Sequence, residues 1–158
     1  MNDSLRTGIT FGLTSGAITT LGLMVGLQAG THSKIVVLGG ILTIAIADAF
    51  SDAVGIHVAE EAENVHTTHE IWVATLATFF SKFIFSLTFV VPVLFLDLST
   101  AVFVNMAWGI SLLTLLSYIM AKAQNEPPWK VIGEHLLIII VVITSTHYVG
   151  EWIAKFVE

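Results

Sequence analysis

The sequence predicts an all-α integral membrane protein, a single domain spanning residues 1–158 with five transmembrane helices in one bundle. Its composition is the first reason, because 55% of the residues are hydrophobic and only 11% are charged, whereas a soluble domain carries about 25% charged residues. The second reason is the presence of five apolar segments, each long enough to cross roughly 30 Å of hydrocarbon as a helix. These segments are residues 8–28, 35–57, 71–96, 101–121 and 131–155.

Short polar stretches separate the apolar segments, as turns between transmembrane helices require. They are residues 29–34, 60–70, 97–99 and 124–128. The first apolar segment is too long for the core of a signal peptide and follows a barely basic start, so we expect no cleavable signal. Five crossings place the two termini on opposite sides of the membrane.

The distribution of basic residues predicts the orientation in the membrane. Arg6, Lys122 and Lys130 lie on the side of the N-terminus, while Lys34 and Lys155 lie on the other side. Because cytoplasmic loops of membrane proteins carry an excess of Lys and Arg, this distribution predicts a cytoplasmic N-terminus.

Composition and motifs exclude several classes of protein. Six Lys and Arg against twelve Asp and Glu give a net charge of −6, which argues against nucleic-acid binding. The absence of cysteine excludes disulfides and thiolate metal sites. The sequence contains no nucleotide-binding loop and no nucleophile constellation, so we expect neither an ATP-driven pump nor a hydrolase.

The first apolar segment carries glycines at every fourth position, in two rows. The rows are Gly8, Gly12 and Gly16, then Gly22, Gly26 and Gly30. Such rows let helix backbones approach closely in lipid. Two interpretations stay open: ordinary close packing, or a self-association interface or transport pathway to which Ser15 and Thr19 present oxygens.

Two carboxylates interrupt the second apolar segment. Asp48 and Asp52 are four residues apart and therefore lie on one face of a helix. Placing one carboxylate at membrane depth costs about 2.5–3.5 kcal/mol, so the pair needs a partner or a function. Continuing the helical wheel brings Glu63 and His66 to the same face, which predicts a column of ligands leading from the surface to the buried pair.

Lys82 interrupts the third apolar segment at a depth that matches the two aspartates. The turn between the second and third helices centres near His66, with Asp52 14 residues before it and Lys82 16 residues after it. An antiparallel pair of helices then predicts an ion pair of Lys82 with Asp52 or Asp48. Lys82 would either only neutralise a buried carboxylate, or compete with a metal ion or proton that binds there.

The turn at residues 60–70 holds four carboxylates and two imidazoles. Glu60, Glu63 and His66 combine hard oxygen and imidazole ligands, which suit a divalent first-row cation such as Fe(II) or Mn(II). Glu63 and His66 also match the i, i+3 pair of carboxylate di-metal sites, although only one copy is present. For the outer residues Glu61, His69 and Glu70 a plain solvated turn remains an alternative.

The last apolar segment contains His147 and Glu151, four residues apart, and begins near Glu134 and His135. His147 is either a hydrogen-bonded structural histidine at a contact between helices or part of a proton relay.

Two stretches resemble the vacuolar iron transporter family of five-helix iron and manganese exporters. Residues 15–26 (SGAITTLGLMVG) resemble the family's first-helix pattern, and residues 47–55 (ADAFSDAVG) resemble the second-helix pattern. The resemblance implies a homodimer that exchanges metal for protons, with the first helices near the dimer axis. It also shows departures, because Ser15 replaces the first-helix aspartate and Asp52 replaces the second-helix methionine. Loss of the thioether favours a harder metal.

The leading hypothesis is a homodimeric transporter in the lipid bilayer that moves Fe²⁺ or Mn²⁺, coupled to protons, without catalysis or a tightly bound cofactor. The expected metal ligands are Asp48, Asp52, Glu60, Glu63 and His66, and the expected auxiliary or pathway residues are Ser15, Thr19, Lys82, His147 and Glu151. One rival is a membrane di-metal oxidase that uses Glu60, Glu63, His66, Glu134 and His135. The other rival is a structural or metal-binding membrane protein whose buried charges are all internally paired.

Overall fold

The computed structural model describes residues 3–157, and this range is helical throughout apart from short connections. The helices are α1 (Asp3–Thr31), α2 (Lys34–Glu63), α3 (Thr68–Thr88), α4 (Val90–Phe95), α5 (Leu98–Gln124) and α6 (Pro128–Val157). With α3 and α4 taken together as one span, five helical segments are long and apolar enough to cross a membrane. The predicted fold class is therefore confirmed, and the helices extend a few residues beyond most of the predicted segments.

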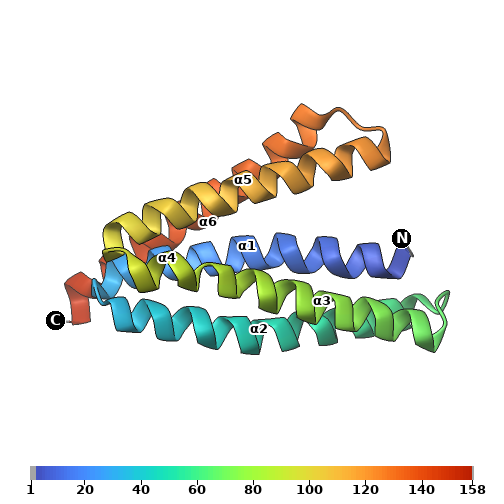
Figure 1. Cartoon of the computed structure of the whole chain (residues 1–158), viewed down its shortest axis with the longest axis horizontal. Helices are drawn as coiled ribbons and strands as arrows, with labels where there is room; N and C mark the ends of the chain where they lie inside the picture. Colours follow the sequence, from blue (N-terminus) through green and yellow to red (C-terminus); the bar gives the residue numbers. More distant parts are fainter. Residues whose placement is uncertain (1–2, 158) are drawn as a thin grey trace.

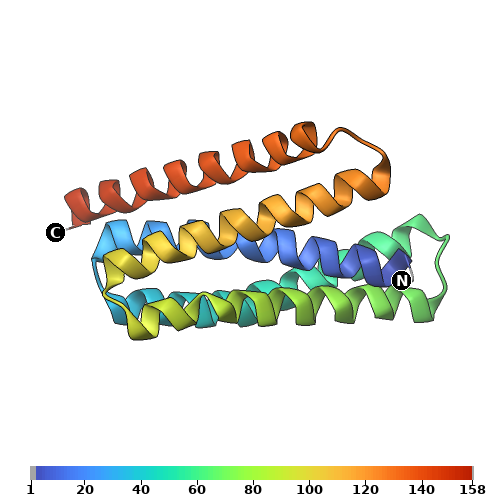
Figure 2. The ribbon, with the colours of Figure 1, turned by 45° about the horizontal axis from the view of Figure 1, so that its top comes forward.

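Helix α1 lies at the centre of the bundle and packs against α2, α3, α5 and α6 (Figure 1). The chain begins and ends at opposite ends of the bundle (Figure 2). The end with the N-terminus also holds the α2–α3 and α5–α6 turns, and we call it the N-terminal end. Helix α5 lies close to the other helices at the opposite end and diverges from α1 toward the N-terminal end in both views.

The two glycine rows of α1 pack inside the chain. A Cβ added at Gly12 would collide with Ser81 Oγ and lie 2.6 Å from the carbonyl oxygen of Thr78, both on α3. A Cβ added at Gly26 would lie 3.2 Å from the carbonyl oxygen of Thr146 on α6. The rows therefore serve close packing against α3 and α6, and of the two interpretations above this is the one that the packing supports.

The third span is interrupted, in contrast to the single helix predicted over residues 71–96. Pro92 lacks the N–H that would bond to the carbonyl four residues earlier, and the helix breaks at Phe89. The carbonyl oxygen of Phe89 accepts a hydrogen bond from Asn105 Nδ2 of α5 at 2.9 Å. A buried amide thus satisfies the backbone that the break exposes, as the membrane interior requires.

The apolar core lies in the half of the bundle away from the N-terminal end. Its fully buried side chains come from the second half of α1, the first half of α2, the α3–α4 junction and α5, and they include Leu21, Met24, Ile41, Phe89 and Val93. In the other half, α1, α2 and α3 meet through small and polar residues instead, and this is where the charged side chains of the membrane interior lie.

Candidate functional site

The ammonium of Lys82 is the centre of a buried charged cluster. Its Nζ atom lies 2.5 Å from Asp48 Oδ2 and 2.5 Å from Asp52 Oδ2. The same atom donates a hydrogen bond to Ser15 Oγ of α1 at 2.8 Å. The ion pair predicted from matching depths is therefore confirmed, and Lys82 contacts both aspartates.

Small residues make room for the long lysine side chain between three helices. On α1, a Cβ added at Gly16 would lie 3.4 Å from Lys82 Cγ, so the lysine stem lies close against a glycine backbone. On α2, Ala49 and Ala53 are buried beside the two aspartates. The sequence thus places alanine and glycine where the helices approach the lysine most closely.

The cluster is buried unequally. The Lys82 side chain is 1% exposed, whereas those of Asp48 and Asp52 are 26% and 18% exposed. Asp52 accepts a hydrogen bond from Nζ, but Asp48 Oδ2 lies within ion-pair distance without a hydrogen-bond partner. Asp48 is thus the less firmly held carboxylate of the two.

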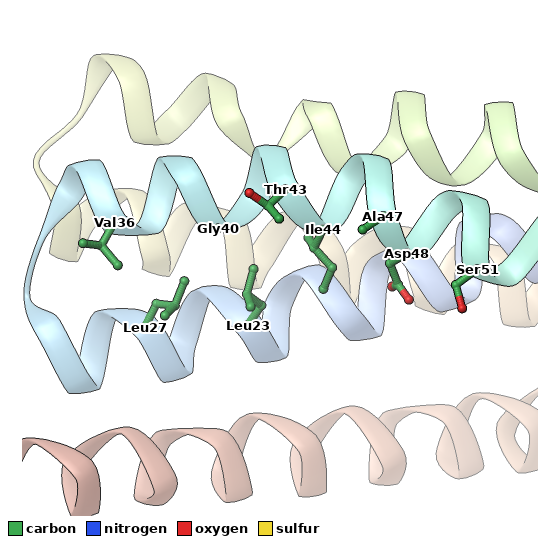
Figure 3. Close-up of a pocket in the computed structure, with 9 residues that line it drawn as sticks. All are labelled: Leu23, Leu27, Val36, Gly40, Thr43, Ile44, Ala47, Asp48 and Ser51. Carbon is green, nitrogen blue, oxygen red and sulfur yellow. The ribbon is translucent and has the colours of Figure 1, made fainter.

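Asp48 lies at one end of a groove between α1 and α2 (Figure 3). The groove has a volume of about 640 Å³, and its walls are largely apolar. Asp48 and Ser51 project from α2 on the side that faces α1, and their oxygens are the polar groups at that end. From there the groove runs along α2 past Gly40 toward Val36, so the cluster can be reached from the end opposite the N-terminal end.

A second polar cluster lies at the N-terminal end. His66 Nε2 lies 3.2 Å from Glu60 Oε2 and 3.8 Å from Glu63 Oε2. The helical wheel that placed His66 on the face of Asp52 is wrong, because α2 ends at Glu63 and Asn64 adopts a left-handed conformation with φ of 53°. The turn brings His66 back toward Glu60 instead.

Glu70, one of the outer residues of the same turn, has a structural function. Its carboxylate accepts hydrogen bonds from the Thr67 amide at 2.9 Å and from the Thr67 hydroxyl at 2.8 Å. The two residues form a capping box at the start of α3. The alternative of a turn residue without a ligand role therefore fits Glu70.

The structure adds His57, which the sequence analysis did not select. His57 Nδ1 lies 3.0 Å from Thr75 Oγ1, and the imidazole packs edge-on against Trp72. Because the Thr75 hydroxyl donates to the carbonyl of Ile71 at 2.7 Å, His57 Nδ1 is the donor toward Thr75. His57 lies between Asp52 and Glu60 along α2, but its partners are on α3, and the periodicity of one helix does not reveal contacts with another.

Three of the predicted auxiliary residues lie outside the buried cluster. Thr19 donates its hydroxyl to the Ser15 carbonyl at 2.9 Å, within its own helix. His147 Nε2 lies 3.4 Å from Glu151 Oε1, and both side chains are more than 40% exposed. Lys155 continues this row on α6, 4.0 Å from Glu151.

The five residues of the di-metal alternative do not come together. His135 Nδ1 is hydrogen-bonded to Ser117 Oγ of α5 at 2.7 Å, and Glu134 is exposed. Neither makes an ion pair or hydrogen bond with Glu60, Glu63 or His66. Across residues 3–157, no three His, Asp or Glu side chains are arranged so that they could hold a metal ion.

No protein-family model, curated protein or solved structure matches this chain. The resemblance to vacuolar iron transporters therefore stays an expectation from the sequence.

Proposed function

We propose that this chain is a membrane transporter that moves a divalent cation in exchange for protons, with the cluster of Lys82, Asp48, Asp52 and Ser15 as its exchange site. The observation that carries the proposal is a fully buried ammonium held between two carboxylates midway along membrane-spanning helices. Ionisable groups at such depth are costly and are typical of ion and proton pathways.

The charges of the cluster support exchange. Two carboxylates and one ammonium leave a net charge of −1 when all three are ionised, so the site attracts one further positive charge. A metal ion that binds the carboxylates must displace the ammonium and any bound proton, because ligands bind metal in their deprotonated form. From a neutral cluster with one protonated carboxyl, loss of that proton and of one Lys82 proton makes the uptake of one divalent ion electroneutral.

The donor atoms favour Mn²⁺ over Fe²⁺ as the cargo. Once the lysine has moved, Asp48, Asp52 and Ser15 offer only oxygen, and carboxylate, carbonyl and water ligands suit Mn²⁺. Glu60, Glu63 and His66 would capture the ion at the surface. Glu60 lies eight residues after Asp52, about 12 Å along the helix.

The open groove beside Asp48 supports a homodimer with a cytoplasmic N-terminus as the transporting form. A carboxylate that is 26% exposed toward an apolar groove in the single chain is unfavourable in lipid. A second copy seated on α1 and α2 would cover it. The orientation rests on the three basic residues of the N-terminal side.

A structural membrane protein is the second candidate, and one observation favours it. Lys82 contacts both aspartates, and no three-ligand metal group is formed within residues 3–157. In that case the cluster would only hold α1, α2 and α3 together, and purified protein would conduct no ion.

Ion uptake into proteoliposomes tests the proposal. We expect saturable Mn²⁺ uptake with release of protons, weaker Fe²⁺ and Co²⁺ uptake, and no dependence on membrane potential. Asp52→Asn should abolish uptake in protein that still elutes as a folded species. Asp97→Asn is the matched control, because Asp97 is an exposed carboxylate at the start of α5 and should leave uptake unchanged.

Two results would reject this function. If folded protein moves none of the three metals, the structural candidate replaces it. If uptake occurs and Asp48→Asn with Asp52→Asn leaves it intact, transport follows another route.

A further inference from the structure

A cavity with a polar mouth opens between α1, α5 and α6 at the N-terminal end. Its volume is about 570 Å³. Four polar side chains lie at the mouth, on the first turns of α1 and at the α5–α6 turn: Arg6, Thr7, Gln124 and His135. Neither the proposed exchange site nor the surface cluster of Glu60, Glu63 and His66 includes any of them.

The mouth of this cavity is electropositive in an acidic protein. Arg6 is its only charged lining residue, although the chain as a whole carries a net charge of −6. No Asp or Glu side chain within residues 3–157 forms an ion pair with Arg6. A guanidinium offers five N–H donors in a fork that matches phosphate oxygens, and Gln124 adds amide donors beside it.

Beneath the mouth, the crevice continues as an apolar channel. A second cavity of about 200 Å³ between α1 and α5 is lined only by Leu, Ile, Ala and Phe side chains. Leu116 and Ile119 line both cavities, so the two are neighbours along α5. The divergence of α5 from α1 toward the N-terminal end produces this wedge-shaped space (Figures 1 and 2).

We propose that this crevice binds one anionic phospholipid from the leaflet at the N-terminal end. The phosphate lies at Arg6 and Gln124, and an acyl chain follows Leu116 and Ile119 into the apolar channel. A polar mouth at the membrane surface above an apolar channel matches the two parts of a lipid. A water-filled path would instead need polar groups along the deeper cavity, and that cavity has none. Basic residues beside a membrane attract anionic headgroups.

The test measures lipid binding to the purified full chain in neutral detergent, by native mass spectrometry and by the shift in Tm. The probes are a phosphatidylglycerol, a phosphatidylcholine with the same acyl chains, and glycerol phosphate with inorganic phosphate as soluble headgroup controls. We expect the phosphatidylglycerol to bind about tenfold more tightly than the phosphatidylcholine, the effect of one hydrogen-bonded charge. The soluble phosphates should give no comparable shift, because they lack the acyl chain.

Two variants separate the contribution of the headgroup from that of the acyl chain. Arg6→Gln should lower phosphatidylglycerol binding to the level of phosphatidylcholine. Lys130→Gln is its control, because Lys130 is an exposed basic residue at the same end but outside the crevice. Leu116→Trp fills the channel and should weaken both lipids, with Tm in the absence of lipid reporting whether it folds.

Equal binding of the two lipids, or unchanged selectivity in Arg6→Gln, would overturn the proposal. So would stabilisation by the soluble phosphates equal to that by lipid, which would mean a simple anion site. All of these readouts are independent of ion transport, so they stand whether or not the proposed function holds.

Discussion

Helices α3 and α6 both pack on a glycine row of α1, yet only α3 also joins α1 through polar side chains. Ser81 of α3 donates to the carbonyl of Gly8 at 3.3 Å, and Lys82 donates to Ser15 at 2.8 Å. Thr20 donates to Ser86 Oγ, which is fully buried with it, at 3.0 Å. The α1–α3 contact is therefore both close and chemically specific.

Helix α6 uses its polar side chains differently. Thr146 donates back to the carbonyl of Val142 on its own helix at 2.9 Å, and His147 pairs with Glu151 one turn on. Between residues 5 and 157, no hydrogen bond or ion pair joins α6 to α1. A glycine row thus allows two helices to approach, but it does not determine which polar groups then cross between them.

The difference predicts that the largest loss of stability follows from changing Lys82. Lys82→Met leaves two carboxylates without their counter-ion in the membrane interior, and removing one partner of a buried ion pair costs about 3–5 kcal/mol. We expect a loss of that size in the free energy of unfolding, measured by denaturant titration in detergent micelles.

Two further variants make this prediction specific to charge. Lys122→Met, the same change at an exposed lysine of α5, should leave stability nearly unchanged. Adding Asp48→Asn and Asp52→Asn to Lys82→Met removes the uncompensated charges and should recover most of the loss. If the triple variant is no more stable than Lys82→Met alone, shape rather than charge determines the effect.

The glycine rows provide the next largest effect. Gly12→Ala forces a Cβ against Ser81 Oγ and the Thr78 carbonyl, and such overpacking costs about 1–3 kcal/mol. Gly26→Ala, whose Cβ would lie 3.2 Å from the Thr146 carbonyl, should cost less because α6 has only to move slightly.

Gly39→Ala is the control for both glycine variants. Its Cβ would meet nothing within 4 Å, so the higher helix propensity of alanine should raise stability slightly. Thermal unfolding of the three variants gives the order. Equal losses at Gly12 and Gly26 would mean that the two helices are equally constrained.

Much of this architecture could be predicted from the sequence, because membrane depth restricts each helix to a simple rule. Five apolar segments required five spans, and equal distances from a shared turn placed Lys82 beside Asp52. The break at Phe89 was missed because the rule counts apolar residues, although Pro92 stands in the segment.

Contacts that depend on how helices face one another were not predictable. Asp48 joins the same lysine as Asp52, and Asn105 bonds the exposed carbonyl of Phe89 from another helix. His66 was misplaced because the wheel assumed that α2 continues, while the left-handed Asn64 ends it. Which of the two glycine rows meets α3 follows from tertiary packing, and both rows have the same spacing.

The row of His147, Glu151 and Lys155 on α6 should contribute little to stability. Exposed pairs four residues apart on a helix contribute about 0.3–0.5 kcal/mol, and both His147 and Glu151 are more than 40% exposed. We expect His147→Ala and Glu151→Gln to change the free energy of unfolding by no more than this. A loss of proton release in the proteoliposome assay, without a loss of stability, would instead assign His147 to a proton relay.

The smallest expected effect is at Asp97, in the connection that leads from α4 to α5. A hydrogen bond from the Thr100 amide, at 3.0 Å, and the nearby Lys34 ammonium hold the pKa of the Asp97 carboxyl below its ordinary value of 3.8. Because the pKa is lower in the folded state, the stabilisation is present above 3.8 and is lost as the pH falls through the folded value.

Asp97→Asn tests this dependence, because asparagine also caps helices but carries no charge. The variant should have a slightly lower Tm than the unchanged chain at neutral pH, and the difference should vanish in acid below 3.8. Asp97→Ala also removes the cap, so its Tm should stay lower at every pH. A difference between Asp97→Asn and the unchanged chain that persists in acid would mean that the shape of the carboxylate, rather than its charge, stabilises the start of α5.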